Sequence, residues 1–175
     1  MSGFSALTAL VVDDNRHMRE LACSLLRGLG FRQAREAGSV ETAWDIVRQQ
    51  KPDIVLVDFD MPGLAGPALI ERIRRAPDSP AHDMAIILMT AFSDKARVLA
   101  SRDAGASEIL AKPISIQSLL DRLVAVIDRP RPLVRAHAYV GPDRRRRVDP
   151  CFDGPYRRCD DKDFLNLDDS AMRRA

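Results

Sequence analysis

Acidic, hydroxyl and lysine side chains stand at the ends of four short apolar runs in this sequence. Asp13 and Asp14 follow ALTALVV, Asp58 follows DIVLV, Thr90 follows AIILM, and Lys112 follows EILA. Three carboxylates brought together repel one another and raise each other's pKa unless a cation shares them. Mg²⁺ takes oxygen ligands in octahedral geometry, which two carboxylates, a main-chain carbonyl and a substrate phosphate could supply. If the fold joins these residues, they predict Mg²⁺-dependent chemistry on a phosphoryl group.

The elements that must position these side chains alternate between apolar runs and amphipathic stretches from residue 6 onward. Short apolar runs are typical of buried parallel strands, so the alternation predicts an α/β fold of repeated strand-helix units. We expect a doubly wound five-stranded parallel sheet with helices on both faces, which binds ligands beyond the carboxyl ends of its strands. The expected strands are 6–14, 31–37, 53–60, 85–90 and 108–112, and the expected helices are 18–29, 39–50, 66–75, 94–104 and 115–129.

Four segments, VVDDN, LVDFDMPGLAG, IILMTAF and AGASEILAKPI, resemble the motifs of response regulator receiver domains in the order of that family. The resemblance covers residues 6–129 and implies the flavodoxin-like receiver fold of a two-component phosphorelay protein. It implies that Asp58 is the phosphoacceptor. It also implies that Mg²⁺ is held by Asp13, Asp14 and Asp58 together with the main-chain carbonyl of Asp60.

The same resemblance assigns Thr90 and Lys112 to contacts with the phosphoryl group, and it implies a cis peptide bond between Lys112 and Pro113. Proline is the residue for which a cis bond costs least. The implied chemistry is sound, because a carboxylate can attack phosphorus while Mg²⁺ and a lysine neutralise charge on the equatorial oxygens. Receiver domains usually carry an aromatic switch residue where this sequence has Ile109. We therefore expect signalling through Thr90 and the helix that follows it, without an aromatic switch.

One pattern occurs twice after residue 130: an aromatic residue followed by x-Gly-Pro-x-Arg-Arg. We expect a receiver domain at 1–130 and an irregular tail at 131–175, whose two copies dock on the receiver's own surface or on a partner. The ring offers area for burial, and the arginines can grip carboxylates or phosphates. A disordered linker with accidental similarity is the alternative. The residues concerned are Tyr139, Arg144 and Arg145 in the first copy and Phe152, Arg157 and Arg158 in the second.

Charge distribution bears on the partners of this chain. Residues 1–130 carry 16 basic and 17 acidic side chains, and residues 131–175 carry 11 and 8. A nucleic-acid-binding regulator that uses the arginines of the tail stays an alternative, but the interspersed acids weaken attraction to a polyanion, so DNA is not the expected partner. We expect a histidine kinase or phosphotransfer protein for the receiver and an unknown downstream protein target for the tail. Homodimerisation through the receiver is a further option.

Enzymatic turnover is not expected, although the stretch DFD resembles the Asp-x-Asp motif of haloacid dehalogenase-like phosphatases. In that family the Asp-x-Asp strand comes first, whereas here the acidic pair precedes it. We expect only Mg²⁺-dependent self-phosphorylation and dephosphorylation of Asp58. No apolar run is long enough to cross a bilayer and no secretion signal is visible, so no membrane contact and a cytoplasmic location are expected. There Cys23, Cys151 and Cys159 would stay reduced, and the last two with His137 fit no familiar zinc spacing.

Overall fold

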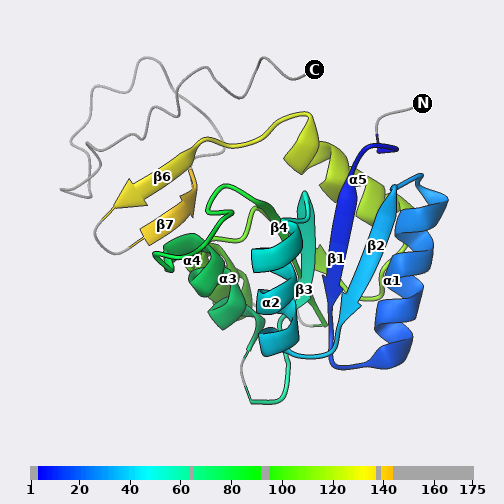
Figure 1. Cartoon of the computed structure of the whole chain (residues 1–175), viewed down its shortest axis with the longest axis horizontal. Helices are drawn as coiled ribbons and strands as arrows, with labels where there is room; N and C mark the ends of the chain where they lie inside the picture. Colours follow the sequence, from blue (N-terminus) through cyan, green and yellow to red (C-terminus); the bar gives the residue numbers. More distant parts are fainter. Residues whose placement is uncertain (1–3, 64, 92–94, 137–138, 144–175) are drawn as a thin grey trace.

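A computed structural model describes residues 4–63, 65–91, 95–136 and 139–143 (Figure 1). Five parallel strands form one sheet in the order β2-β1-β3-β4-β5, which confirms the doubly wound fold expected from the sequence. The strands are β1 (Thr8–Val12), β2 (Gln33–Ala37), β3 (Ile54–Asp58), β4 (Ala85–Thr90) and β5 (Glu108–Ala111). The helices are α1 (Arg16–Gly28), α2 (Val40–Gln50), α3 (Gly66–Arg75), α4 (Lys95–Ala104) and α5 (Ile116–Ile127).

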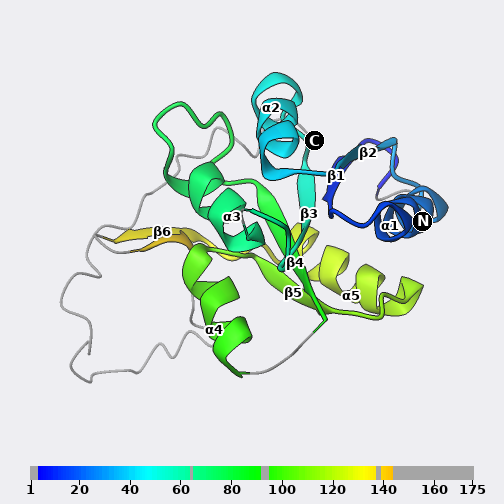
Figure 2. The ribbon, with the colours of Figure 1, turned by 90° about the horizontal axis from the view of Figure 1, so that it is seen from below.

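Helices cover both faces of the sheet, with α1 and α5 on one side and α2, α3 and α4 on the other (Figure 2). Successive side chains of a strand point to opposite faces, so β1 sends Val11 towards α1 and α5 and Val12 towards α2 and α3. Both are fully buried. Burial on two faces explains why the central strands appear in the sequence as unbroken apolar runs. Burial of each large aliphatic side chain stabilises the fold by about 1.5–3 kcal/mol.

Side-chain caps fix where the helices begin, and therefore where the loops at the strand ends stop. Asn15 starts α1 by accepting hydrogen bonds from the main-chain nitrogens of His17 and Met18, immediately after the acidic pair. Ser39 caps α2, and Ser115 forms a capping box with Ser118 at the start of α5. An N-cap side chain satisfies amide groups that have no partner within the helix. None of the helices in the described residues has the length and apolar character needed to cross a bilayer.

Two further strands follow α5 that the sequence analysis did not predict. β6 (Leu133–Ala136) and β7 (Tyr139–Pro142) pair antiparallel, and β7 packs against α3 and α4 (Figure 1). The contact brings two backbones together at glycines. A Cβ on Gly141 would lie 2.7 Å from the Cα of Gly105, and a Cβ on Gly105, where φ is +100°, would lie 2.6 Å from the carbonyl oxygen of Val140. Only glycine permits so close an approach.

The buried Arg74 ties α3 to the segments on which this hairpin rests. Its side chain has no exposed surface and donates to the carbonyls of Gly105 and His82, at 3.1 and 2.6 Å, and to Ser107 Oγ at 3.3 Å. Burial lowers the pKa of Arg74 to about 10, and the nearby Tyr139 offsets part of that effect. The guanidinium thus stays charged at neutral pH, and its three hydrogen bonds to protein oxygens offset the cost of burying that charge.

Removing the hairpin is expected to destabilise the domain. A chain ending at residue 130 uncovers the surface above Gly105 and Arg74, so its free energy of unfolding should fall by at least about 2 kcal/mol relative to a chain of residues 1–143. Urea denaturation of the two chains measures this difference. Equal midpoints for both would show that the hairpin contributes nothing to the fold.

Candidate functional site

The carboxyl ends of four strands bring the predicted site residues to one edge of the sheet. Asp13 follows β1, Asp58 ends β3, Thr90 ends β4 and Lys112 follows β5. One carboxylate oxygen each from Asp13, Asp14 and Asp58 lies within 4.8 Å of the others. The residues singled out by their spacing in the sequence therefore lie together in space.

Lys112 joins two of these carboxylates. Its Nζ lies 2.8 Å from Asp13 Oδ2 and 2.8 Å from Asp58 Oδ1. Burial alone would lower the pKa of Lys112, but hydrogen bonds to both carboxylates outweigh it and raise the pKa. The main-chain nitrogen of Lys112 donates to the Thr90 carbonyl at 2.8 Å, and the peptide bond between Lys112 and Pro113 is cis, as expected.

The two acids that follow β1 differ in exposure. Asp13 is 1% exposed, and its Oδ1 accepts a hydrogen bond of 2.8 Å from the main-chain nitrogen of Asn15. Asp14 is exposed, and Asp58 is 5% exposed at the base of the cluster. Burial raises the pKa of Asp58, Lys112 offsets part of that rise, and the charge of Asp13 adds to it.

The donor set fits a hard divalent cation. When ionised, three carboxylates beside one ammonium group leave two negative charges uncompensated, and all the available donor atoms are oxygens. Mg²⁺ has the matching charge and prefers these ligands. Asp13, Asp14 and Asp58 are the residues whose carboxylates would hold it.

The loop after β3 links Asp58 to α3. The main-chain nitrogen of Gly66 donates to the Phe59 carbonyl at 3.0 Å, which turns the chain back over the end of β3. A Cβ added to Gly66 would lie 1.9 Å from the carbonyl oxygen of Asp58. The glycine is therefore required for the position of Asp58, a role that the sequence analysis did not assign to it.

Arg97 on α4 is a second residue that the sequence analysis missed. Its guanidinium forms an ion pair with the carboxylate of Asp60 and lies 4.9 Å from the ring centroid of Phe59. Both partners belong to the loop after β3, so Arg97 connects α4 to the chain that follows Asp58. In the sequence, Arg97 is one of several charged residues of a predicted helix, and its partners are identified only by the fold. The role of the Asp60 main-chain carbonyl as a ligand stays a prediction.

The positions expected to carry the signal are placed as follows. Thr90 is buried at the end of β4, and Ile109 lies partly buried on β5 opposite Leu88 of β4. Tyr139 lies on β7 and donates to the Pro142 carbonyl at 2.7 Å. The other tail residues singled out by the repeat, Arg144, Arg145, Phe152, Arg157 and Arg158, lie outside the described residues.

The fold and this site define the protein class. Residues 9–124 match the family model described as response regulator receiver domain. The chain belongs to that family, and it is a response regulator of two-component signalling.

Similar proteins agree with this assignment. The chain is 33% identical over 126 residues to a probable chemotaxis protein CheY of Rhizobium etli, a match that covers 72% of this chain and 96% of the relative. It is also 33% identical over 125 residues to the phosphate regulon transcriptional regulatory protein PhoB of Pseudomonas aeruginosa, covering 71% of this chain but only 53% of that relative. A putative response regulator of Chloroflexus aurantiacus has a similar structure, with a TM-score of 0.65, 33% identity, and coverage of 70% of this chain and 98% of that one.

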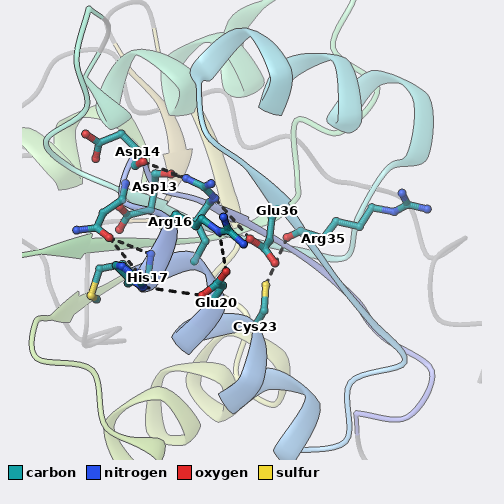
Figure 3. Close-up of polar contacts among 11 residues, drawn as sticks. Asp13, Asp14, Arg16, His17, Glu20, Cys23, Arg35 and Glu36 are labelled. Atoms are coloured by element: carbon teal, nitrogen blue, oxygen red, sulfur yellow. Dashed lines mark hydrogen bonds and ion pairs between the residues drawn. The ribbon is translucent and has the colours of Figure 1, made fainter.

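A polar network lies on the α1 side of the site (Figure 3). It joins Arg19 of α1 to Glu36 of β2 through an ion pair of 3.5 Å, and Cys23 lies buried beside it. Burial raises the pKa of Cys23 to about 11, and the charge of Glu36 adds to the rise. The thiol is therefore protonated at neutral pH.

Cys23 is expected to resist alkylation in the folded protein. A shift from 9 to about 11 lowers the thiolate fraction at pH 8 by about 100-fold, and the thiolate is the reactive form. Mass mapping after iodoacetamide treatment at pH 8 should find Cys23 unmodified in the native protein and modified in urea. Modification of Cys23 at the same rate in both states would contradict the burial and pKa described here.

Proposed function

We propose that this chain accepts a phosphoryl group on the carboxylate of Asp58 from a phosphohistidine of a histidine kinase or phosphotransfer protein. A carboxylate oxygen of Asp58 forms the new bond to phosphorus. The bond from phosphorus to the donor's imidazole nitrogen breaks, and its electron pair stays on that nitrogen. The observation that carries the proposal is the position of Lys112, 2.8 Å from both Asp13 and Asp58, beside a cluster of three carboxylates.

The residues around Asp58 have separate roles in this transfer. Asp13, Asp14 and Asp58 would hold Mg²⁺ with the main-chain carbonyl of Asp60, and the ion supplies positive charge against the phosphoryl oxygens when bound. Lys112 neutralises charge on a further phosphoryl oxygen. Its present bonds to two carboxylates keep the ammonium group within reach of any group attached to Asp58.

Thr90 is proposed to contact the phosphoryl group from β4. It lies at the end of the strand next to that of Asp58, and its carbonyl accepts a hydrogen bond from Lys112. Thr90 and Lys112 are thus held together by their main chains, so a displacement of one is transmitted to the other.

Phosphorylation is proposed to change which protein the chain binds, with the tail contributing to that surface. The first copy of the repeat supports docking on the receiver's own surface, because Tyr139, Gly141 and Pro142 belong to the hairpin that packs on α3 and α4. No observation on the described residues favours a phosphatase or a nucleic-acid-binding regulator. A cytoplasmic location accords with a phosphodonor of this class.

Incubation with acetyl phosphate tests the proposed phosphorylation. We expect a mass increase of one phosphoryl group per chain in the presence of Mg²⁺ and none after chelation with EDTA. A phosphatase would instead release phosphate continuously from p-nitrophenyl phosphate. Sustained turnover of that ester, or labelling that survives EDTA, would overturn the proposal.

A further inference from the structure

Arg19 binds the main chain of the acidic pair rather than its carboxylates. Its Nη1 donates to the main-chain carbonyl of Asp13 at 2.7 Å and to that of Asp14 at 3.0 Å. One nitrogen thereby binds two consecutive peptide groups in the loop between β1 and α1. Its side chain is only 16% exposed, so water competes little for these bonds.

These two hydrogen bonds fix the direction of the carboxylates. The carbonyls of Asp13 and Asp14 lie beyond the last residue of β1, where the strand ladder no longer orients the peptide planes. The orientation of a peptide plane sets the direction of the neighbouring Cα–Cβ bonds. Arg19 therefore restrains both planes together, alongside the hydrogen bond from the Asn15 nitrogen to Asp13 Oδ1, and with them the backbone from which the side chains of Asp13 and Asp14 extend.

A second set of contacts holds Arg19 in place and offsets its charge. A cation beside the acidic pair would by itself weaken the binding of a metal ion, but the Nε of Arg19 lies 3.5 Å from the carboxylate of Glu36. Gly38, in the loop after β2, also lies beside the guanidinium, because a Cβ at this position would be in van der Waals contact with Nη1 of Arg19, at 3.4 Å. Three segments of the fold therefore shape the position of this one side chain.

We propose that Arg19 is a positioning residue for Asp13 and Asp14 and that it sets the affinity of the site for Mg²⁺. The inference rests on the proposed function, because it concerns the metal of the same site. Residues that orient metal ligands typically change affinity by about 10- to 100-fold when they are removed. Arg19 acts on the backbone that carries the ligands, so we expect an effect near the lower end of that range.

Isothermal titration of the full chain with Mg²⁺ alone, without a phosphodonor, tests this role. Arg19→Gln should weaken Mg²⁺ binding about tenfold. Arg19→Lys keeps the charge but cannot reproduce the guanidinium geometry. Its affinity for Mg²⁺ should therefore lie between that of the wild type and that of Arg19→Gln. The matched control is Arg16→Gln, one turn earlier on α1. The side chain of Arg16 is 78% exposed and pairs with Glu20. That variant should bind Mg²⁺ like the wild type.

Labelling by acetyl phosphate at increasing Mg²⁺ separates positioning from chemistry. If Arg19 only positions the ligands, saturating Mg²⁺ restores the labelling rate of Arg19→Gln to within about twofold of the wild type. A folded Arg19→Gln variant with wild-type or tighter Mg²⁺ affinity would overturn the inference while leaving the proposed function intact. A wild-type chain that binds no Mg²⁺ would overturn both.

Glu36→Gln provides a second variant in case Arg19→Gln does not fold. It keeps both hydrogen bonds from Arg19 but removes the carboxylate that holds and neutralises the guanidinium. We expect Mg²⁺ affinity to fall about threefold in this variant, because an uncompensated cation then lies behind the acidic pair. Unchanged affinity would show that the Arg19 network does not act on the metal site.

Discussion

Asp58→Asn is expected to abolish labelling by acetyl phosphate. The amide lacks the nucleophilic oxygen that attacks phosphorus, and it also removes one of the three carboxylates of the Mg²⁺ cluster. Asparagine has nearly the same shape as aspartate, so the variant should fold with the wild-type helix content. Intact-protein mass spectrometry after incubation with Mg²⁺ and acetyl phosphate measures the loss.

The matched control is Asp60→Asn, two residues further along the same loop. This change loses the ion pair with Arg97 but keeps the main-chain carbonyl at position 60. Labelling should therefore continue, with a rate within about threefold of the wild type, since an ion pair to a half-exposed carboxylate contributes little. A phosphoryl group found on the Asp58→Asn chain would contradict this assignment and show that another residue is the phosphoacceptor.

Gly66→Ala is expected to slow labelling by about 100-fold. The new Cβ would lie 1.9 Å from the Asp58 carbonyl oxygen and 3.2 Å from Cγ2 of Val57, so the end of β3 or the start of α3 must shift. Displacing a reacting group by about 1 Å can cost about two orders of magnitude in rate. The same overlap should lower the free energy of unfolding by about 1–3 kcal/mol.

Gly28→Ala is the control for Gly66→Ala. No atom lies within 4 Å of the position that a Cβ would take at Gly28, which belongs to the last turn of α1. Alanine is the better helix former, so this variant should be as stable as the wild type or slightly more so. Labelling rates come from a time course, and unfolding free energies come from urea denaturation. A Gly66→Ala chain labelled at the wild-type rate would contradict the role of the loop.

The fold was predictable because its central strands are buried on both faces. β3 and β4 appear in the sequence as uninterrupted apolar runs, and the one helix between them, α3, has apolar residues at helical spacing. The hairpin of β6 and β7 was not predictable in this way. Its strands have only four residues each. β7 also contains Gly141 and Pro142, and a Gly-Pro pair usually indicates a turn. Only the contact with Gly105 shows why they are there.

The candidate site was predictable where a residue ends a strand and not where it acts from elsewhere. Asp58 and Lys112 follow apolar runs, so the topology alone brings them to one edge. Arg19 lies within α1, where an arginine usually indicates a solvent-exposed face of the helix. Its partner Glu36 lies on β2. Gly66 is required by a backbone contact that no spacing reveals.

The hairpin lies at the end of the sheet opposite Asp58. It rests on Gly105 and, through Arg131, on the Ser107 carbonyl, both of which precede β5, whereas Asp58 ends β3. In a parallel sheet the amino and carboxyl ends of the strands are separated by the full strand length. A phosphodonor at Asp58 and a protein attached at Asp143 therefore need not compete for space. If Asp58 accepts a phosphoryl group as proposed, the phosphodonor can therefore reach it while the segment after the hairpin is in contact with a partner.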